Sequence, residues 1–124
     1  MYDEVIYSKL ITCIEHIEAI EKYFKDVQNS EQFFSLNDGV QYDAILMRLQ
    51  ALGENLKRIS QKHTFVIKDL DYAEIDNVIR FRDYVSHHYE QLENEVIFDI
   101  CSLKIPVLKR CIVLLINKQY NMLL

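Results

Sequence analysis

Residues 79–89 read Ile-Arg-Phe-Arg-Asp-Tyr-Val-Ser-His-His-Tyr, and they predict the second half of a helix with a charge on its packing face. Arg82 lies on this face, four residues after Val78 and three before Val85. A guanidinium cannot lose its charge, so we expect a paired anion or a bound water beside it. Apolar side chains recur along the face at helical spacing: Ile75, Val78, Ile79, Val85 and Tyr89.

Further polar side chains crowd the end of this helix. Asp83 lies four residues before His87, a spacing at which two helical side chains can touch. A carboxylate beside an imidazole favours the protonated ring and fixes its orientation. Asp83 could also pair with Arg82, and the sequence does not choose between the two. Together with Tyr89, these groups form an arrangement typical of a functional site.

The order of these residues resembles a known protein family. Arg82, four intervening residues, His87, one residue and then Tyr89 are similar to the signature of the HepT-like toxins of the HEPN superfamily. In that family the arginine is usually followed by Asn or Asp, and here it is followed by Asp83.

Two other segments carry the same resemblance. Gly53 and Glu54 resemble the family's Gly-Glu pair on the preceding long helix. Residues 92–108, which include Pro106, resemble its final helix and its proline. The similarity runs from about residue 38 to residue 108, and the first predicted helix fits by length and position.

The resemblance implies both a fold and an activity. The fold is all-α, a four- to five-helix up-and-down bundle that occupies residues 1–124 as one HEPN-like domain and forms a two-fold dimer. In HEPN ribonucleases an arginine and a histidine from two subunits face each other and cut RNA without a metal. Arg82 and His87 are therefore the candidate catalytic residues. A histidine can move the proton of a ribose 2′-hydroxyl, and an arginine can stabilise the charge that develops on phosphorus, which leaves a 2′,3′-cyclic phosphate.

The resemblance also implies a partner. In HepT-like toxins a small nucleotidyltransferase antitoxin adenylylates the matching tyrosine, which is Tyr89 here, and so silences the toxin. Asp83, His88 and Glu54 are auxiliary candidates. His88 is next to the motif histidine but not in its place. Glu54 either forms a surface ion pair with Arg58, four residues later, or holds the arginine of the site.

The composition favours long helices and gives no global attraction to nucleic acid. The chain of 124 residues has only two glycines and one proline, so it is poor in turn residues. Its net charge is −5, and any RNA contact must be local, made by Arg80, Arg82 and the histidines, or must come from a partner. We expect no metal and no other cofactor.

The cysteines and the apolar segments indicate a cellular compartment. Three cysteines without paired metal spacing predict buried free thiols in a reducing environment. No apolar run approaches the ~18 residues of a membrane span, and no secretory signal is evident. These patterns predict a cytoplasmic protein that does not enter a membrane.

Helical spacing predicts four long helices, over about residues 3–27, 39–61, 72–88 and 94–120. Asp71 is the expected N-cap of the third, with Glu74 completing a capping box. Residues 63–70 are expected to be a connection that could contain one extended or helical turn around residues 65–67. Gly53 in mid-helix costs about 1 kcal/mol of helix stability relative to alanine, so we expect it to permit a close helix crossing. Pro106 should kink the last helix, whose apolar surface extends all round and predicts a subunit interface.

Two other functions remain open from the sequence. The chain could be a non-catalytic helical partner that presents substrate or nucleotide to a separately encoded nucleotidyltransferase. It could also be a purely structural dimer with a polar interface. Growth arrest and RNA cleavage in the absence of any partner would distinguish the toxin from the non-catalytic partner.

Overall fold

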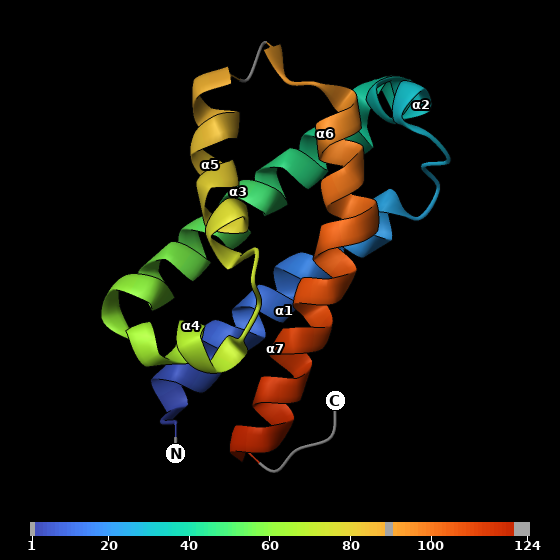
Figure 1. The fold of residues 1–124 in the computed structure, drawn as a ribbon. Helices are drawn as coiled ribbons and strands as arrows, with labels where there is room; N and C mark the ends of the chain where they lie inside the picture. Colours follow the sequence, from blue (N-terminus) through green and yellow to red (C-terminus); the bar gives the residue numbers. More distant parts are fainter. Residues whose placement is uncertain (1, 89–90, 121–124) are drawn as a thin grey trace.

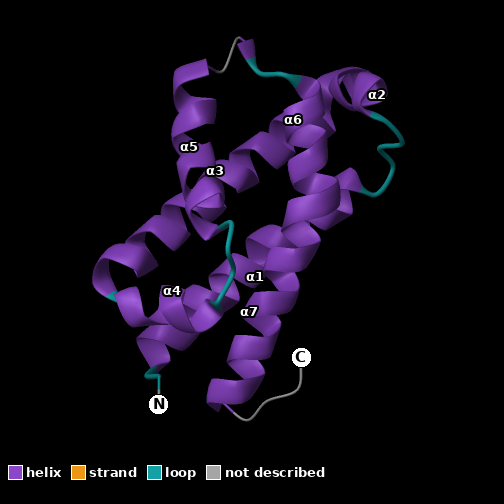
Figure 2. Cartoon of the chain, viewed as in Figure 1, coloured by secondary structure: helices purple, strands orange, loops and turns teal. Residues whose placement is uncertain are grey.

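The computed structural model describes residues 2–88 and 91–120, and within these ranges the chain is helical with no strand (Figure 2). The all-α prediction is confirmed. The long elements are α1 (Glu4–Phe24), α3 (Val40–Lys62), α5 (Ile75–His88) and a last segment in three parts, α6 (Asn94–Asp99), η3 (Ile100–Lys104) and α7 (Ile105–Tyr120). Short helices join them: α2 (Ser30–Ser35), η1 (Leu36–Gly39) and α4 (Thr64–Leu70).

The long helices alternate in direction to form a bundle (Figure 1). α1 and α3 run antiparallel and pack against each other along much of their length. α5 packs against α3 near the middle of α3. The segment α6–α7 then returns along α1. The stripe predicted for α3 faces the core, and its members are all buried: Ile45, Leu49, Leu52, Leu56 and Ile59.

The start of α1 follows from its sequence. The Asp3 carboxylate accepts a hydrogen bond from the backbone N–H of Ile6 at 3.0 Å, which satisfies one of the donors that a helix leaves free at its first turn. At the other end of the chain, the Tyr120 hydroxyl donates to the backbone oxygen of Asp3 at 2.8 Å. This hydrogen bond fixes the last turn of α7 to the first turn of α1.

The predicted start of the third long helix is wrong. Asp71 has left-handed backbone angles, φ 53° and ψ 45°, and ends α4, while α5 begins only at Ile75. Glu74 forms no capping box, because its carboxylate pairs with Lys104 in η3. The expected connection 63–70 is mostly the helix α4, whose Val66 and Leu70 are buried at a spacing of four residues.

The disturbance expected at Pro106 takes the form of a π-helical turn. Proline has no backbone N–H and its ring would clash with the carbonyl four residues earlier in a regular helix. The turn immediately before it, Ile100–Lys104, is wider, and the N–H of Ile105 donates to the oxygen of Ile100, five residues back. The last helix therefore continues through the proline to Tyr120.

The cysteines are free, and two of them lie in the core. Burial raises the pKa of Cys13 and of Cys101 to about 12, so both thiols stay protonated at neutral pH. Cys111 is half-buried. In the described part of the chain, no helix combines the length and the apolar character that crossing a bilayer requires.

Candidate functional site

The candidate site is built where α5 crosses α3, and Gly53 is the residue that permits the crossing. A Cβ atom at position 53 would lie 2.9 Å from the Cβ of Arg82 and 3.5 Å from the backbone oxygen of Val78. Real Cβ atoms do not approach so closely, so a larger residue would push the helices apart. The crossing predicted from Gly53 is confirmed, and its partner is the arginine itself.

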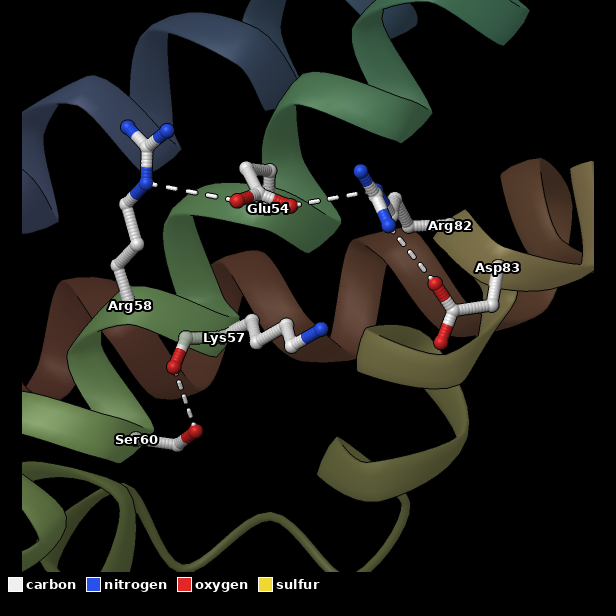
Figure 3. A network of polar contacts seen from close by, with 6 residues as sticks. All are labelled: Glu54, Lys57, Arg58, Ser60, Arg82 and Asp83. Atoms are coloured by element: carbon white, nitrogen blue, oxygen red, sulfur yellow. Dashed lines mark hydrogen bonds and ion pairs between the residues drawn. The ribbon is translucent and has the colours of Figure 1, made fainter. Parts of the chain in front are cut away.

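The crossing brings Glu54 of α3 to the arginine of α5 (Figure 3). Nε of Arg82 lies 3.2 Å from Oε2 of Glu54, and Nε of Arg58 lies 3.5 Å from Oε1 of the same carboxylate. Glu54 therefore does both things that the sequence left open: it pairs with Arg58 and it pairs with Arg82. Arg82 has the paired anion that its place on a packing face requires, and its side chain is 38% exposed.

The contact between Glu54 and Arg82 is an ion pair without a hydrogen bond. Oε2 of Glu54 is buried and accepts no hydrogen bond from the described residues, although Nε lies 3.2 Å away. A charged oxygen withdrawn from water depends strongly on the nearest opposite charge. Glu54 therefore holds the guanidinium by attraction and leaves its orientation to a second partner.

That second partner is Asp83. Nη1 of Arg82 donates a hydrogen bond to Oδ1 of Asp83 at 2.9 Å. This bond lowers the pKa of Asp83, and the nearby charges of Lys57, Arg82 and His87 lower it further. Of the two partners that the sequence left open, Asp83 bonds to Arg82, while His87 acts on it only through its charge.

His87 lies apart from Arg82 within one chain. His87 lies five positions after Arg82 on the helix, which turns the two side chains about 140° away from each other around the axis. His87 is exposed, and no hydrogen bond or ion pair among the described residues joins it to Arg82. Between them, Ser86 donates from its hydroxyl to the backbone oxygen of Arg82 at 3.0 Å. One chain therefore presents the two candidate catalytic groups on different faces of α5.

The remaining candidates fall at the edge of the described chain. α5 ends at His88, whose side chain lies outside the described residues, as does the whole of Tyr89. Lys57 was not among the sequence candidates, yet its charge acts on Asp83. Its position three residues after Glu54 on one helix face was the available signal.

Comparison with known proteins places the chain in a family. The model of a family described as Ribonuclease HepT-like matches residues 13–115, which extends beyond the motif similarity in both directions. No curated protein and no solved structure gives a significant match. The matched region contains the whole crossing of α3 and α5, with Gly53, Glu54 and Arg82. The chain therefore belongs to the HepT-like ribonuclease family of the HEPN superfamily.

Proposed function

We propose that this protein is the toxin of a toxin–antitoxin pair and cleaves RNA as an endoribonuclease that needs no metal. One observation carries the proposal: in a chain of this ribonuclease family, Arg82 is held between Glu54 and Asp83 and still exposes 38% of its side chain. A fixed guanidinium that remains open to solvent can bind a phosphate with its planar set of donors.

The reaction is transfer of the phosphate to the neighbouring ribose hydroxyl. His87 takes the proton of the 2′-hydroxyl, and the 2′-oxygen forms a bond to phosphorus. The bond from phosphorus to the 5′-oxygen breaks, and that oxygen takes a proton from water. Arg82 stabilises the charge that develops on the phosphate oxygens, and the products are a 2′,3′-cyclic phosphate and a free 5′-hydroxyl.

The site is composite and uses two copies of the chain. Arg82 and His87 point about 140° apart on α5, so a single chain does not present both groups to one phosphate. A two-fold axis close to α5 would place Arg82 of one copy beside His87 of the other.

Exposed apolar surface on the last helical segment, together with a groove beside α5, supports association with a second copy. Leu103, Val107 and Leu114 are exposed at spacings of four and seven residues along η3 and α7, as one stripe of a helix. A mainly apolar groove of about 190 Å³ lies between α5 and the α6–η3 segment, where Phe81 and Ile100 form part of its lining. Burial of such surface favours association.

Tyr89 is the proposed point of control. An AMP group on its hydroxyl would add a negative charge and a base close to the end of α5, where it would compete with RNA for the cationic groups. Mass spectrometry of the chain co-expressed with its nucleotidyltransferase should find AMP on Tyr89, and the Tyr89→Phe variant should gain none. Silencing without any AMP on Tyr89 would instead indicate inhibition by direct binding.

Cleavage by purified protein tests the proposal. His87→Ala should lower the rate about a hundred- to ten-thousandfold, and Arg82→Lys should also fail because an ammonium lacks the planar donors of a guanidinium. A chelator should leave the rate unchanged. His63→Ala is the matched control, since His63 ends α3 away from the crossing and should keep full activity. Full activity of His87→Ala, or loss of activity with the chelator, would contradict the mechanism.

A further inference from the structure

Cations from two helices converge on the carboxylate of Asp83. Arg82 donates to it at 2.9 Å, and the charges of Lys57 on α3 and His87 on α5 also act on it. In Figure 3 the side chain of Lys57 extends from α3 toward α5, on the side where Asp83 lies. The network drawn there contains three permanent cations, Lys57, Arg58 and Arg82, and two carboxylates. A protein with a net charge of −5 thus has a local excess of positive charge at this point.

We propose that this convergence is a phosphate-binding site for an RNA strand, that Lys57 is one of its ligands, and that Asp83 occupies it when no RNA is bound. The inference rests on the proposed function, because it assigns the substrate-binding groups of the same site. A phosphodiester carries one negative charge and anionic oxygens that accept hydrogen bonds, as the carboxylate does. RNA therefore binds by displacing Asp83 from Arg82, and its phosphate takes the place of the carboxylate near the charge of Lys57.

The position of Asp83 makes the displacement possible. The side chains of neighbouring helix residues do not face each other, so the Arg82 side chain reaches Asp83 only by turning sideways along the helix surface. The Asp83 side chain is 51% exposed, and ion pairs open to solvent are weak. Glu54 faces Nε of Arg82, whereas Asp83 bonds Nη1. When Asp83 leaves, the attraction of Glu54 still keeps the guanidinium at the crossing, and Nη1 is freed for a phosphate oxygen, which then sets its orientation.

Asp83 thereby sets a threshold for binding. A weakly bound anion must compete with a carboxylate that is always present, while a strand with several phosphates gains enough contacts to displace it. Lys57 provides a cation from the opposite helix, so the phosphate is held between α3 and α5. Asp83 and Lys57 are binding residues in this account, and neither takes part in proton transfer.

The test is binding of a short 2′-O-methyl RNA strand, which lacks the attacking hydroxyl and cannot be cleaved. Fluorescence anisotropy at fixed salt would measure its Kd for the wild type and for variants. Asp83→Asn should bind about two- to fivefold tighter, the range expected for one exposed ion pair. Lys57→Gln should bind weaker by a similar factor, and by a larger factor in the Asp83→Asn background, where the Asp83 carboxylate no longer offsets the charge of Lys57.

Matched controls separate a local effect from a change in net charge. Asp76→Asn removes the same charge seven residues earlier on the same face of α5, and Lys62→Gln removes an exposed lysine from the last turn of α3. Both should change Kd by less than about twofold. In addition, the slope of log K against log salt should steepen by about 0.7 in Asp83→Asn, as for one more neutralised phosphate of a single strand.

The outcomes distinguish this inference from the proposed ribonuclease activity. Equal Kd values for Asp83→Asn and Asp76→Asn, or no loss in Lys57→Gln relative to Lys62→Gln, would overturn the binding site even if the wild type cleaves RNA. The expected pattern of Kd values in a protein that cleaves no RNA would support the binding site and contradict the catalytic role of His87. Thermal melts of each variant verify that the fold is kept.

Discussion

At the scale of single residues, the position of a charge depends on contacts that the sequence indicates only in part. The need of Arg82 for an anion could be predicted, because its place in the apolar stripe of the helix is visible in the residue order. Which anion it takes could not, since Glu54 reaches it only through the crossing of α3 and α5. Tyr89, the proposed modification site, lies outside the described residues, so its exposure stays a prediction.

A second residue-scale contact joins α1 to α3 and gives a pH dependence. Nη1 of Arg48 donates to Nδ1 of His16 at 3.1 Å, which requires the neutral imidazole. Burial lowers the pKa of His16, and Arg48 lowers it further against the opposing charge of Glu15. The unfolded chain therefore binds a proton at a pH where the folded chain does not.

This contact predicts that the protein loses stability as the pH falls below the ordinary histidine value of about 6.5. Denaturant titrations at pH 7.5 and pH 5.5 would measure the free energy of unfolding. His16→Gln should remove part of the difference, about 0.5 kcal/mol or less because the pair is partly open to solvent. His63→Gln is the control and should keep the wild-type difference. The same pH dependence in His16→Gln and the wild type would contradict the assignment.

At the scale of helices, the sequence predicted which helices form better than it predicted where each helix begins and ends. The α3 stripe and the extent of the last helix followed from apolar spacing. α4 was predicted only as one possible extended or helical turn, because its seven residues are too few to show a long helical period. Asp71 was assigned to the wrong helix, because an aspartate that can cap a following helix can also adopt left-handed angles that end the preceding one. The π turn before Pro106 depends on how the surrounding helices hold the proline.

The crossing of α3 and α5 predicts a specific sensitivity at Gly53. Alanine at this position would gain about 1 kcal/mol of helix propensity, but its Cβ would lie 2.9 Å from the Cβ of Arg82. Overpacking of this kind typically costs about 1–3 kcal/mol, so we expect a net loss of stability and a lower Tm. RNA cleavage should also fall, because separation of the helices weakens the contact between Glu54 and Arg82.

Gln61→Ala is the control for Gly53→Ala. It adds an alanine at an exposed position in the last turn of the same helix and should change stability by less than about 0.5 kcal/mol. A Gly53→Ala protein as stable and as active as the wild type would mean that α5 can move away from α3 without consequence for the site.

At the scale of the whole molecule, the bundle leaves apolar surface that its own helices do not cover. Leu103 and Leu114 are 63% and 61% exposed on the outer side of the last helical segment. The sequence predicted this surplus, since apolar residues surround that helix. The sequence could not show which apolar residues of the last helix face the core and which stay exposed, because that depends on the packing of α7 against α1 and α4.

The proposed dimer predicts a mass of twice 14.8 kDa in light scattering at micromolar concentration. Leu103→Glu should shift the protein toward the monomer, because a carboxylate in a buried interface loses its hydration without gaining a partner. Val5→Glu changes a similarly exposed apolar residue at the start of α1 and should leave the mass unchanged. A wild-type monomer under these conditions would exclude a site shared between two copies.

The most direct test of the shared site mixes two inactive variants. Chains with Arg82→Lys and chains with His87→Ala would be co-expressed with different tags, and the mixed dimer would be purified through both tags in turn. Each mixed dimer has one site with an intact arginine from one chain and an intact histidine from the other. A shared site should give the mixed dimer about half of the wild-type cleavage rate, while each variant alone stays inactive. A mixed dimer no more active than the two variants alone would contradict a site built from both chains.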